Sequence, residues 1–288
     1  MTLEQILPLQ CELGEAPVWD PVSQTAYLVD IIRCRLIAIA WSTGATKEWP
    51  MPSLGGGLAL CRDGRLLVAT QTGLFFFSPA TGEYDFFMHP EPGMPKNRLN
   101  EGKVDPEGRF WIGSMCTVGR QPTGALYRID VNGAAERVLG DLFVPNCLVW
   151  TLDRRSVLFA DSHRKLIWSF AYDAATGALS NQQIFSELPS YRGTPDGGAL
   201  DQDGCLWNAE FGGSRVVRFA PDGREIGQID LPATQITSCA FVGPRLDHLM
   251  ITSTKRMLSE DQRRTQAHAG DVFIVRPGAM GIAEPLLA

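Results

Sequence analysis

The chain has 288 residues, of which 44% are hydrophobic and 20% charged, a balance typical of a globular protein with a substantial apolar core. Its formal net charge is −6 and its basic residues are scattered, which argues against nucleic acid or an anionic membrane as the main partner. No apolar run approaches the ~18–20 residues that span a bilayer. The N-terminal segment lacks the basic and apolar regions of a signal peptide, so we expect a cytoplasmic protein.

Seven cysteines are widely spaced and include no C-x-x-C pair: Cys11, Cys34, Cys61, Cys116, Cys147, Cys205 and Cys239. An odd, dispersed set is typical of reduced thiols rather than of a disulfide framework or a zinc cluster. We expect most of them to serve as small buried hydrophobic residues.

A block of strands and tight turns recurs along the chain. The six copies begin near Pro17, Gly57, Lys103, Leu148, Gly198 and Ala240. These starts lie roughly 40–50 residues apart, the spacing of four-stranded propeller blades. Each copy contains apolar strands joined by turns such as Thr81-Gly82 and Asp222-Gly223. The sequence therefore predicts an all-β, six-bladed propeller with antiparallel blades, occupying residues 1–288 as one domain. A pair of β-sandwiches would not require six copies in register.

The two segments outside this pattern lie near the ends of the chain. Residues Glu4 to Leu9 precede the first copy and have strand-like character. We expect them to pair as the outer strand of the last blade, because an unpaired edge would otherwise be exposed where the ring closes. Residues Ser259 to Ala269 are the one stretch with helical periodicity, and we expect an irregular insertion in the sixth blade there.

Placing the six copies in register exposes a row of polar residues. The last apolar residues of the first strands are Trp19, Leu60, Val104, Trp150, Leu200 and Phe241. Four positions earlier stand Glu15, Gly56, Asn100, Asn146, Asp196 and Thr237. The innermost strand of each blade enters near the axis on one face, so equivalent positions should converge at the mouth of the channel. Four of the six carry a carboxylate or an amide.

This row predicts a site for one divalent metal ion. A single Asn or Asp before a strand is more often an ordinary turn or capping residue. That explanation fits four converging positions poorly, because two carboxylates close together repel each other and call for a neutralising cation. Oxygen donors favour Ca²⁺, Mg²⁺ or Mn²⁺, and Zn²⁺ also accepts carboxylates. Two carboxylates and one amide leave positions open for water or substrate, as in a catalytic site.

Four segments carry a resemblance to a known family. They are LGEAPVWD from Leu13, RLNEGKVDPEGRFWIGSM from Arg98, VPNCLVW from Val144 and PDGGALDQDGCLW from Pro195. In this order and spacing they resemble the SMP-30/gluconolactonase/regucalcin family over essentially the whole chain. The resemblance implies a six-bladed propeller, in agreement with the repeat count, and the hydrolysis of a sugar lactone.

The resemblance also implies roles for individual residues. Glu15, Asn146 and Asp196 would coordinate the metal, and Arg98, Asn100 and Glu101 would contact the substrate. Two positions depart from the family pattern. Glu101 stands where Asp is more usual, which lengthens the side chain by one methylene, and Cys147 stands where Gly commonly follows the Asn ligand. Neither change removes a metal ligand.

These residues suggest a mechanism of lactone hydrolysis. Asp196 is our preferred general base because it could touch the metal and a nearby water at once. Arg98 could bind substrate hydroxyls or a carboxylate and stabilise the developing oxyanion. The sequence offers no covalent alternative, since Ser114 lies outside a G-x-S-x-G elbow.

The substrate is a sugar lactone of open identity. Arg192 and Lys255 neighbour the predicted site face, and if both reach the pocket they would favour lactones of uronic or aldaric acids. Neutral aldonolactones are otherwise the family expectation. His163 follows a strand end and could point into the channel mouth, although an exposed loop position is the simpler expectation. A calcium-binding regulatory propeller without turnover and a broader metal-dependent esterase are the alternatives.

Overall fold

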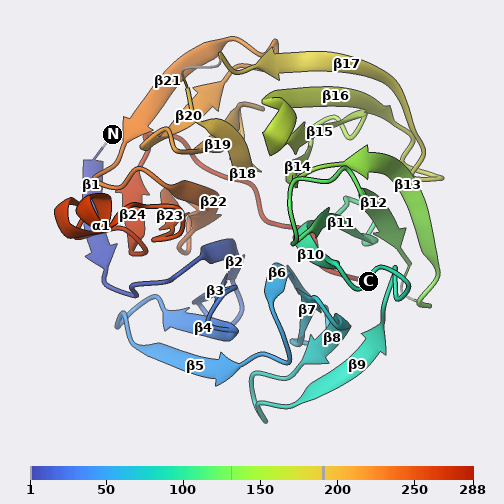
Figure 1. Ribbon diagram of the computed structural model, residues 1–288, viewed down its shortest axis with the longest axis horizontal. Coiled ribbons are helices and arrows are strands. Elements are labelled where there is room, and N and C mark those ends of the chain that lie inside the picture. Colours follow the sequence, from blue (N-terminus) through green and yellow to red (C-terminus); the bar gives the residue numbers. More distant parts are fainter. Residues whose placement is uncertain (1, 131, 190–191) are drawn as a thin grey trace.

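The computed structural model describes residues 2–130, 132–189 and 192–288, and within them six four-stranded sheets surround a central axis (Figure 1). Every pairing between neighbouring strands within a sheet is antiparallel. The protein is a six-bladed β-propeller, which confirms the prediction from the repeat. The first strand of each blade lies nearest the axis and the fourth lies at the rim.

The first three blades follow one another along the chain. Blade 1 consists of β2 (Gly14–Asp20), β3 (Thr25–Asp30), β4 (Arg35–Ala40) and β5 (Thr46–Pro50). Blade 2 consists of β6 (Gly55–Leu60), β7 (Leu66–Thr70), β8 (Gly73–Phe77) and β9 (Tyr84–Met88). Blade 3 consists of β10 (Asn97–Val104), β11 (Phe110–Cys116), β12 (Gly124–Ile129) and β13 (Ala135–Leu142).

The remaining blades complete the ring. Blade 4 consists of β14 (Pro145–Trp150), β15 (Ser156–Asp161), β16 (Leu166–Tyr172) and β17 (Leu179–Glu187), with the 3₁₀ turn η1 (Ser162–Arg164) after β15. Blade 5 consists of β18 (Thr194–Leu200), β19 (Leu206–Phe211), β20 (Arg215–Phe219) and β21 (Glu225–Asp230). Blade 6 consists of β22 (Ile236–Val242), β23 (His248–Ser253), β24 (Val272–Arg276) and β1 (Thr2–Leu7).

The ring is closed by the N-terminal strand, as predicted. Strand β1 pairs antiparallel with β24, with Leu3 opposite Val275 and Leu7 opposite Val272. The strand begins and ends two residues earlier than the expected segment, which ran from Glu4 to Leu9. The insertion predicted in the sixth blade lies between β23 and β24 and contains one short helix, α1 (Glu260–Thr265). A capping box between Ser259 and Gln262 defines the start of this helix.

Six apolar clusters hold the blades together, one at each interface between neighbours. The inner three strands of a blade are buried on both faces, which explains their nearly continuous hydrophobic sequences. The outer strands, such as β17 and β21, are mostly polar and exposed. All seven cysteines are free thiols, and six of them are buried, in agreement with the sequence analysis.

Buried aspartates fix the turns between the first two strands of blades 3 and 5. The Asp105 side chain accepts hydrogen bonds from two backbone N–H groups of its turn and from Trp111 Nε1, the last at 2.9 Å. Asp201 and Trp207 repeat this arrangement, again at 2.9 Å. Each turn contains a glycine with positive φ, Gly108 or Gly204, as a tight turn of this kind requires.

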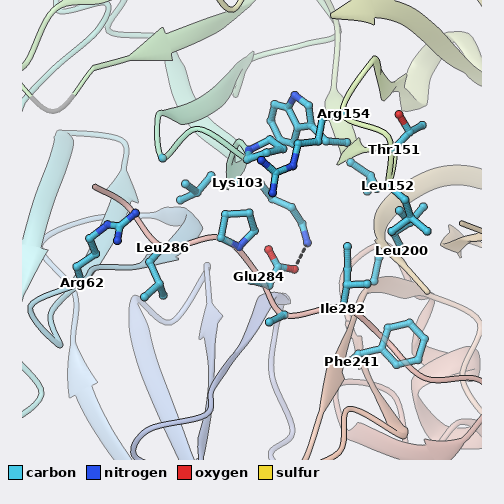
Figure 2. Close-up of a pocket in the computed structure, with 18 residues that line it drawn as sticks. Arg62, Lys103, Thr151, Leu152, Arg154, Leu200, Phe241, Ile282, Glu284 and Leu286 are labelled. Atoms are coloured by element: carbon cyan, nitrogen blue, oxygen red, sulfur yellow. Dashed lines mark hydrogen bonds and ion pairs between the residues drawn. The ribbon is translucent and has the colours of Figure 1, made fainter. Parts of the chain in front are cut away.

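The C-terminal segment crosses the face of the ring where the inner strands end (Figure 1). Its backbone makes isolated bridges to blades 2 and 5, at Cys61–Leu287 and Asp201–Gly281. Beneath it lies a cavity of about 450 Å³, in which Lys103 and Glu284 form an ion pair of 2.5 Å (Figure 2). Among the described residues, no helix is long and apolar enough to cross a bilayer.

Candidate functional site

The predicted row of polar residues lies where each innermost strand departs from regular pairing. In all six blades the register with the second strand shifts at the row: between Glu15 and Val18, Gly55 and Gly57, Leu99 and Gly102, Asn146 and Val149, Pro195 and Gly198, and Ile236 and Ser238. In two blades the next residue is left-handed, with φ of 49° at Ala16 and 48° at Cys147. Cys147 thus occupies a conformation that glycine adopts more readily. Bulges of this kind re-aim side chains, here toward the axis.

The four carboxylate and amide residues of the row form the floor of one cavity. Glu15, Asn100, Asn146 and Asp196 all line it, and the cavity volume is about 710 Å³. All four residues are buried, with exposed fractions of 8%, 6%, 4% and 6% respectively. The cavity opens on the face where the inner strands begin, opposite the face that the C-terminal segment crosses. The structure therefore brings together the residues that the aligned repeats selected.

The other two positions of the row do not line the cavity. Backbone atoms of blade 3 approach Gly56 so closely that a Cβ there would lie 2.6 Å from the Leu99 carbonyl oxygen. Thr237 is fully buried and its hydroxyl donates a hydrogen bond to the Gly14 carbonyl oxygen at 2.6 Å. At these positions blades 2 and 6 contribute only packing, and the polar side chains of the floor come from the other four blades.

A chain of hydrogen bonds orients the amides. Arg98 Nη1 donates to Asn100 Oδ1 at 2.7 Å, and Asn100 Nδ2 donates to Asn146 Oδ1 at 3.0 Å. Asn146 Nδ2 donates to Ser162 Oγ at 2.8 Å, and this hydroxyl donates to the Pro195 carbonyl oxygen at 2.6 Å. Because the amide nitrogen of Asn146 is held by Ser162, its oxygen faces Asn100 and keeps a second lone pair.

The two floor carboxyl groups, of Glu15 and Asp196, have raised pKa values. Burial, reinforced by the charge of Glu101, raises the pKa of Glu15 to about 8, although Arg98 lowers it. Burial, followed by the charges of Glu15 and Glu101, raises the pKa of Asp196 well above its usual range. Burial lowers the pKa of Arg98 to about 10, so this guanidinium is a cation at neutral pH. Two acids that are costly to ionise together are the expected signature of a functional site.

The floor fits a divalent cation by its donor chemistry. The predicted ligands supply two carboxylates and one amide oxygen, which are hard donors suited to Ca²⁺ or Mg²⁺. A bound cation would favour the ionised forms of both carboxyls, whose pKa values burial and then neighbouring negative charges raise. Among the described residues no group of three or more His, Cys, Asp or Glu side chains could hold a metal. The predicted set differs from such a group because its third donor is Asn146.

Glu101 is not among the residues that line the cavity, although the sequence placed it with Arg98 and Asn100. It is buried, and its charge acts on Lys103 and Glu284 as well as on the floor carboxylates. Burial raises the pKa of Glu101 to about 7, partly offset by Lys103. Glu101 is turned away from the cavity because successive side chains of strand β10 point to opposite sides. Glu101 is thus coupled electrostatically both to the floor carboxylates and to the Lys103–Glu284 ion pair.

The two basic residues proposed to select acidic lactones do not line the cavity. Arg192 is instead engaged in ion pairs with Glu210 and Glu225 of its own blade. Lys255 also lies outside the lining, and its neighbour Arg256 takes that place. His163 is exposed, as expected, and also lines the mouth, where its ring packs 4.5 Å from that of Phe143.

Sequence reasoning missed several residues of the cavity and its surroundings. Ser162 supports the floor, while Arg120, Lys165 and Arg256 line the upper part. Loop residues of this kind carry no repeat signal. A signal did exist for Glu101, however, because the position after the row is occupied in the other blades by Ala16, Gly57, Cys147, Gly197 and Ser238. A single large acid among five small residues marks this position as different, and in the structure the Glu101 side chain is buried.

Comparison with known proteins places this arrangement in a family. Residues 13–255 match the family described as SMP-30/gluconolactonase/LRE-like region. This chain belongs to that family. It is 33% identical to 6-deoxy-6-sulfogluconolactonase of Pseudomonas putida over 100% of this chain and 99% of that protein. It is also 33% identical to a pentonolactonase of Haloferax volcanii, over 99% of this chain and 97% of that protein.

A solved family structure has the same architecture. The calcium-binding protein regucalcin of Agrobacterium tumefaciens superposes with a TM-score of 0.95 at 29% identity, covering 99% of this chain and 98% of that one. The family membership suggested by four short segments is thus confirmed over nearly the whole propeller.

Proposed function

We propose that this protein hydrolyses a sugar lactone to the open-chain sugar acid, using one divalent metal ion held by Glu15, Asn146 and Asp196. The observation that carries the proposal is the cavity floor itself. Two buried carboxylates with raised pKa values share it with an oriented amide, and the half-buried Arg98 stands beside them. Relatives over the full chain length are named as sugar lactonases, which supports the same reaction class.

The chain's own residues divide the work of hydrolysis. When bound, a divalent ion would polarise the lactone carbonyl and lower the pKa of a water molecule. Asp196 acts as general base and accepts the proton of the attacking water, because its carboxyl lies at the buried floor of the cavity that admits the substrate. Arg98 and Asn100 lie on the substrate side of the floor, where Arg98 stabilises negative charge that develops on the carbonyl oxygen.

Glu101 acts from below the floor rather than by touching substrate. Its charge raises the pKa of both floor carboxylates, so it increases the negative potential that attracts a cation. Lys103 in turn balances Glu101 from the opposite side. This assignment replaces the substrate contact inferred from the family resemblance.

A calcium-binding regulatory propeller without turnover is the second candidate, favoured by the similarity to regucalcin. It uses the same carboxylates but gives no role to Arg98 or to a 710 Å³ cavity above the ion. A broader metal-dependent esterase gives no role to the four cationic side chains of the lining. These features favour the lactonase.

The test is a pH-indicator assay on a panel of aldonolactones and uronic or aldaric acid lactones. We expect turnover that a chelator abolishes and that added Ca²⁺, Mg²⁺, Mn²⁺ or Zn²⁺ restores. Asp196→Asn should lower kcat at least a hundredfold, within the range of a lost general base. Glu91→Gln is the matched control, because it also converts a buried carboxylate to an amide but lies outside the cavity. Turnover that survives both chelation and Asp196→Asn would contradict the proposal.

A further inference from the structure

The charges around the cavity have the opposite sign to the protein as a whole. Four cationic side chains line it, from Arg98, Arg120, Lys165 and Arg256, against the two carboxylates of Glu15 and Asp196. Even with both acids ionised, the lining carries a formal charge of +2 (four cations less two anions), whereas the whole chain carries −6. A bound divalent cation would make the cavity more positive still. A neutral substrate needs no such field, because a local positive potential acts on charged ligands.

The cations are arranged at two heights. Arg98 lies at the floor, half-buried, with its guanidinium donating to Asn100 Oδ1 and to the Leu99 carbonyl oxygen. Arg120 lies in the loop after β11 and Arg256 in the loop after β23, and both are exposed at the rim. The rim cations therefore come from blades 3 and 6, on opposite sides of the ring (Figure 1).

The rim arginines differ from the other cations in their partners. Among the described residues, no carboxylate lies within ion-pair distance of the guanidinium group of Arg120 or Arg256. The Lys165 ammonium, by contrast, donates to the Arg192 carbonyl oxygen at 2.6 Å. The charge of Arg256 also lowers the pKa of Arg98, so two like charges face the same space. The two rim guanidinium groups, which have no carboxylate partner of their own in the described part of the chain, are available to an anionic ligand.

We propose that Arg120 and Arg256 bind an anionic group of the substrate, so that the enzyme acts on anionic sugar lactones in preference to neutral ones. This inference rests on the lactonase function proposed above. The lactone carbonyl lies at the floor, near Asp196 and Arg98, and the carboxylate or sulfonate at the far end of the sugar chain reaches the rim. The guanidinium group is suited to both anions because its N–H donors match paired oxygens.

The experiment compares three substrates that differ only at C6: glucono-1,5-lactone, its C6 carboxylate and its C6 sulfonate. We expect kcat/KM to be at least about tenfold higher for one or both anionic lactones, the size of one hydrogen bond to a charged group. Arg256→Met and Arg120→Met should each reduce this preference, and the double variant should remove it. Raising the salt concentration should weaken the preference, because exposed charges are screened.

Two controls separate the possible failures. Arg62→Met removes one positive charge from the opposite face and should leave the ratio of anionic to neutral kcat/KM unchanged. Binding of the open-chain C6 dicarboxylate to the metal-free protein, measured by calorimetry, should weaken about tenfold in Arg256→Met without reference to turnover. If no lactone is hydrolysed, the proposed function fails. If all three are hydrolysed equally well, or the preference survives in the double variant, the function stands and this inference is overturned.

Discussion

Protons and the metal ion should compete for the floor of the cavity. The carboxyl groups of Glu15 and Asp196 have raised pKa values because they are buried and close to other negative charges. A metal binds their ionised forms, so binding must displace any proton that they hold. Lowering the pH from 9 to 6 is the perturbation, and the metal dissociation constant is the quantity that responds.

The pKa of about 8 at Glu15 sets the size of the effect. Roughly ten of every eleven such carboxyls are protonated at pH 7, so the apparent affinity should be about tenfold weaker at pH 7 than at pH 9, and about a hundredfold weaker at pH 6. The raised pKa of Asp196 should steepen this dependence beyond one proton. An ordinary glutamate with a pKa of 4.5 would show no change over this range.

Calorimetric titration of the chelator-treated protein with Ca²⁺ or Mn²⁺ measures the affinity. Repeating the titration in two buffers of different ionisation enthalpy counts the protons released, and we expect about one or more per ion at pH 7. In Asp196→Asn the number of released protons should fall by the number that the Asp196 carboxyl releases in the unmodified protein. A dissociation constant that stays the same from pH 6 to 8.5, with no proton release, would show that these carboxyls are already ionised when the metal binds.

The same pKa shift affects the stability of the metal-free protein. The folded-state pKa of Glu15 lies above its ordinary value of 4.5. Its stabilising contribution to the free energy of unfolding is therefore fully present below pH 4.5 and is lost as pH rises through about 8. The Tm of the chelated protein should therefore fall between pH 6 and 9 relative to that of the metal-saturated protein, measured by differential scanning calorimetry. Parallel pH profiles for the two forms would contradict this.

Three further substitutions test the packing around the site. Lys103→Met should lower the free energy of unfolding by about 3–5 kcal/mol at pH 8, because the buried Glu101 and the half-buried Glu284 lose their cation. Urea unfolding should show a smaller loss at pH 5, and an equal loss would argue against this explanation. Gly197→Ala places a Cβ 2.1 Å from Ser238 Oγ and should cost about 1–3 kcal/mol, with partial recovery in the double variant carrying Ser238→Gly. Trp207→Phe removes the 2.9 Å hydrogen bond to the buried Asp201 and should cost about 1.5–3 kcal/mol in the same assay, whereas a neutral result would show that the bond is dispensable.

The repeat, the fold and the floor of the cavity could all be predicted from the order of the amino acids. Each blade carries the same local pattern of apolar strands and turns, so its strand boundaries could be found without knowledge of its neighbours. Positions that are equivalent in such copies become equivalent in space when the ring closes. For this reason the row that contains Glu15, Asn100, Asn146 and Asp196 converged as predicted. The closing strand could be placed as well, because a ring leaves a single edge to be covered.

Which neighbouring side chains reach the cavity depends on how the blades and loops pack in three dimensions. Glu101 follows Asn100 directly, but the bulge and the alternation of β10 turn it away from the lining. Arg192 is drawn to Glu210 and Glu225, while Arg256 occupies the rim that Lys255 was expected to reach. These outcomes depend on partners that are distant in the sequence and on loop conformations outside the repeat. The repeat pattern carries no information about either, so the rim that we propose selects the substrate became visible only in three dimensions.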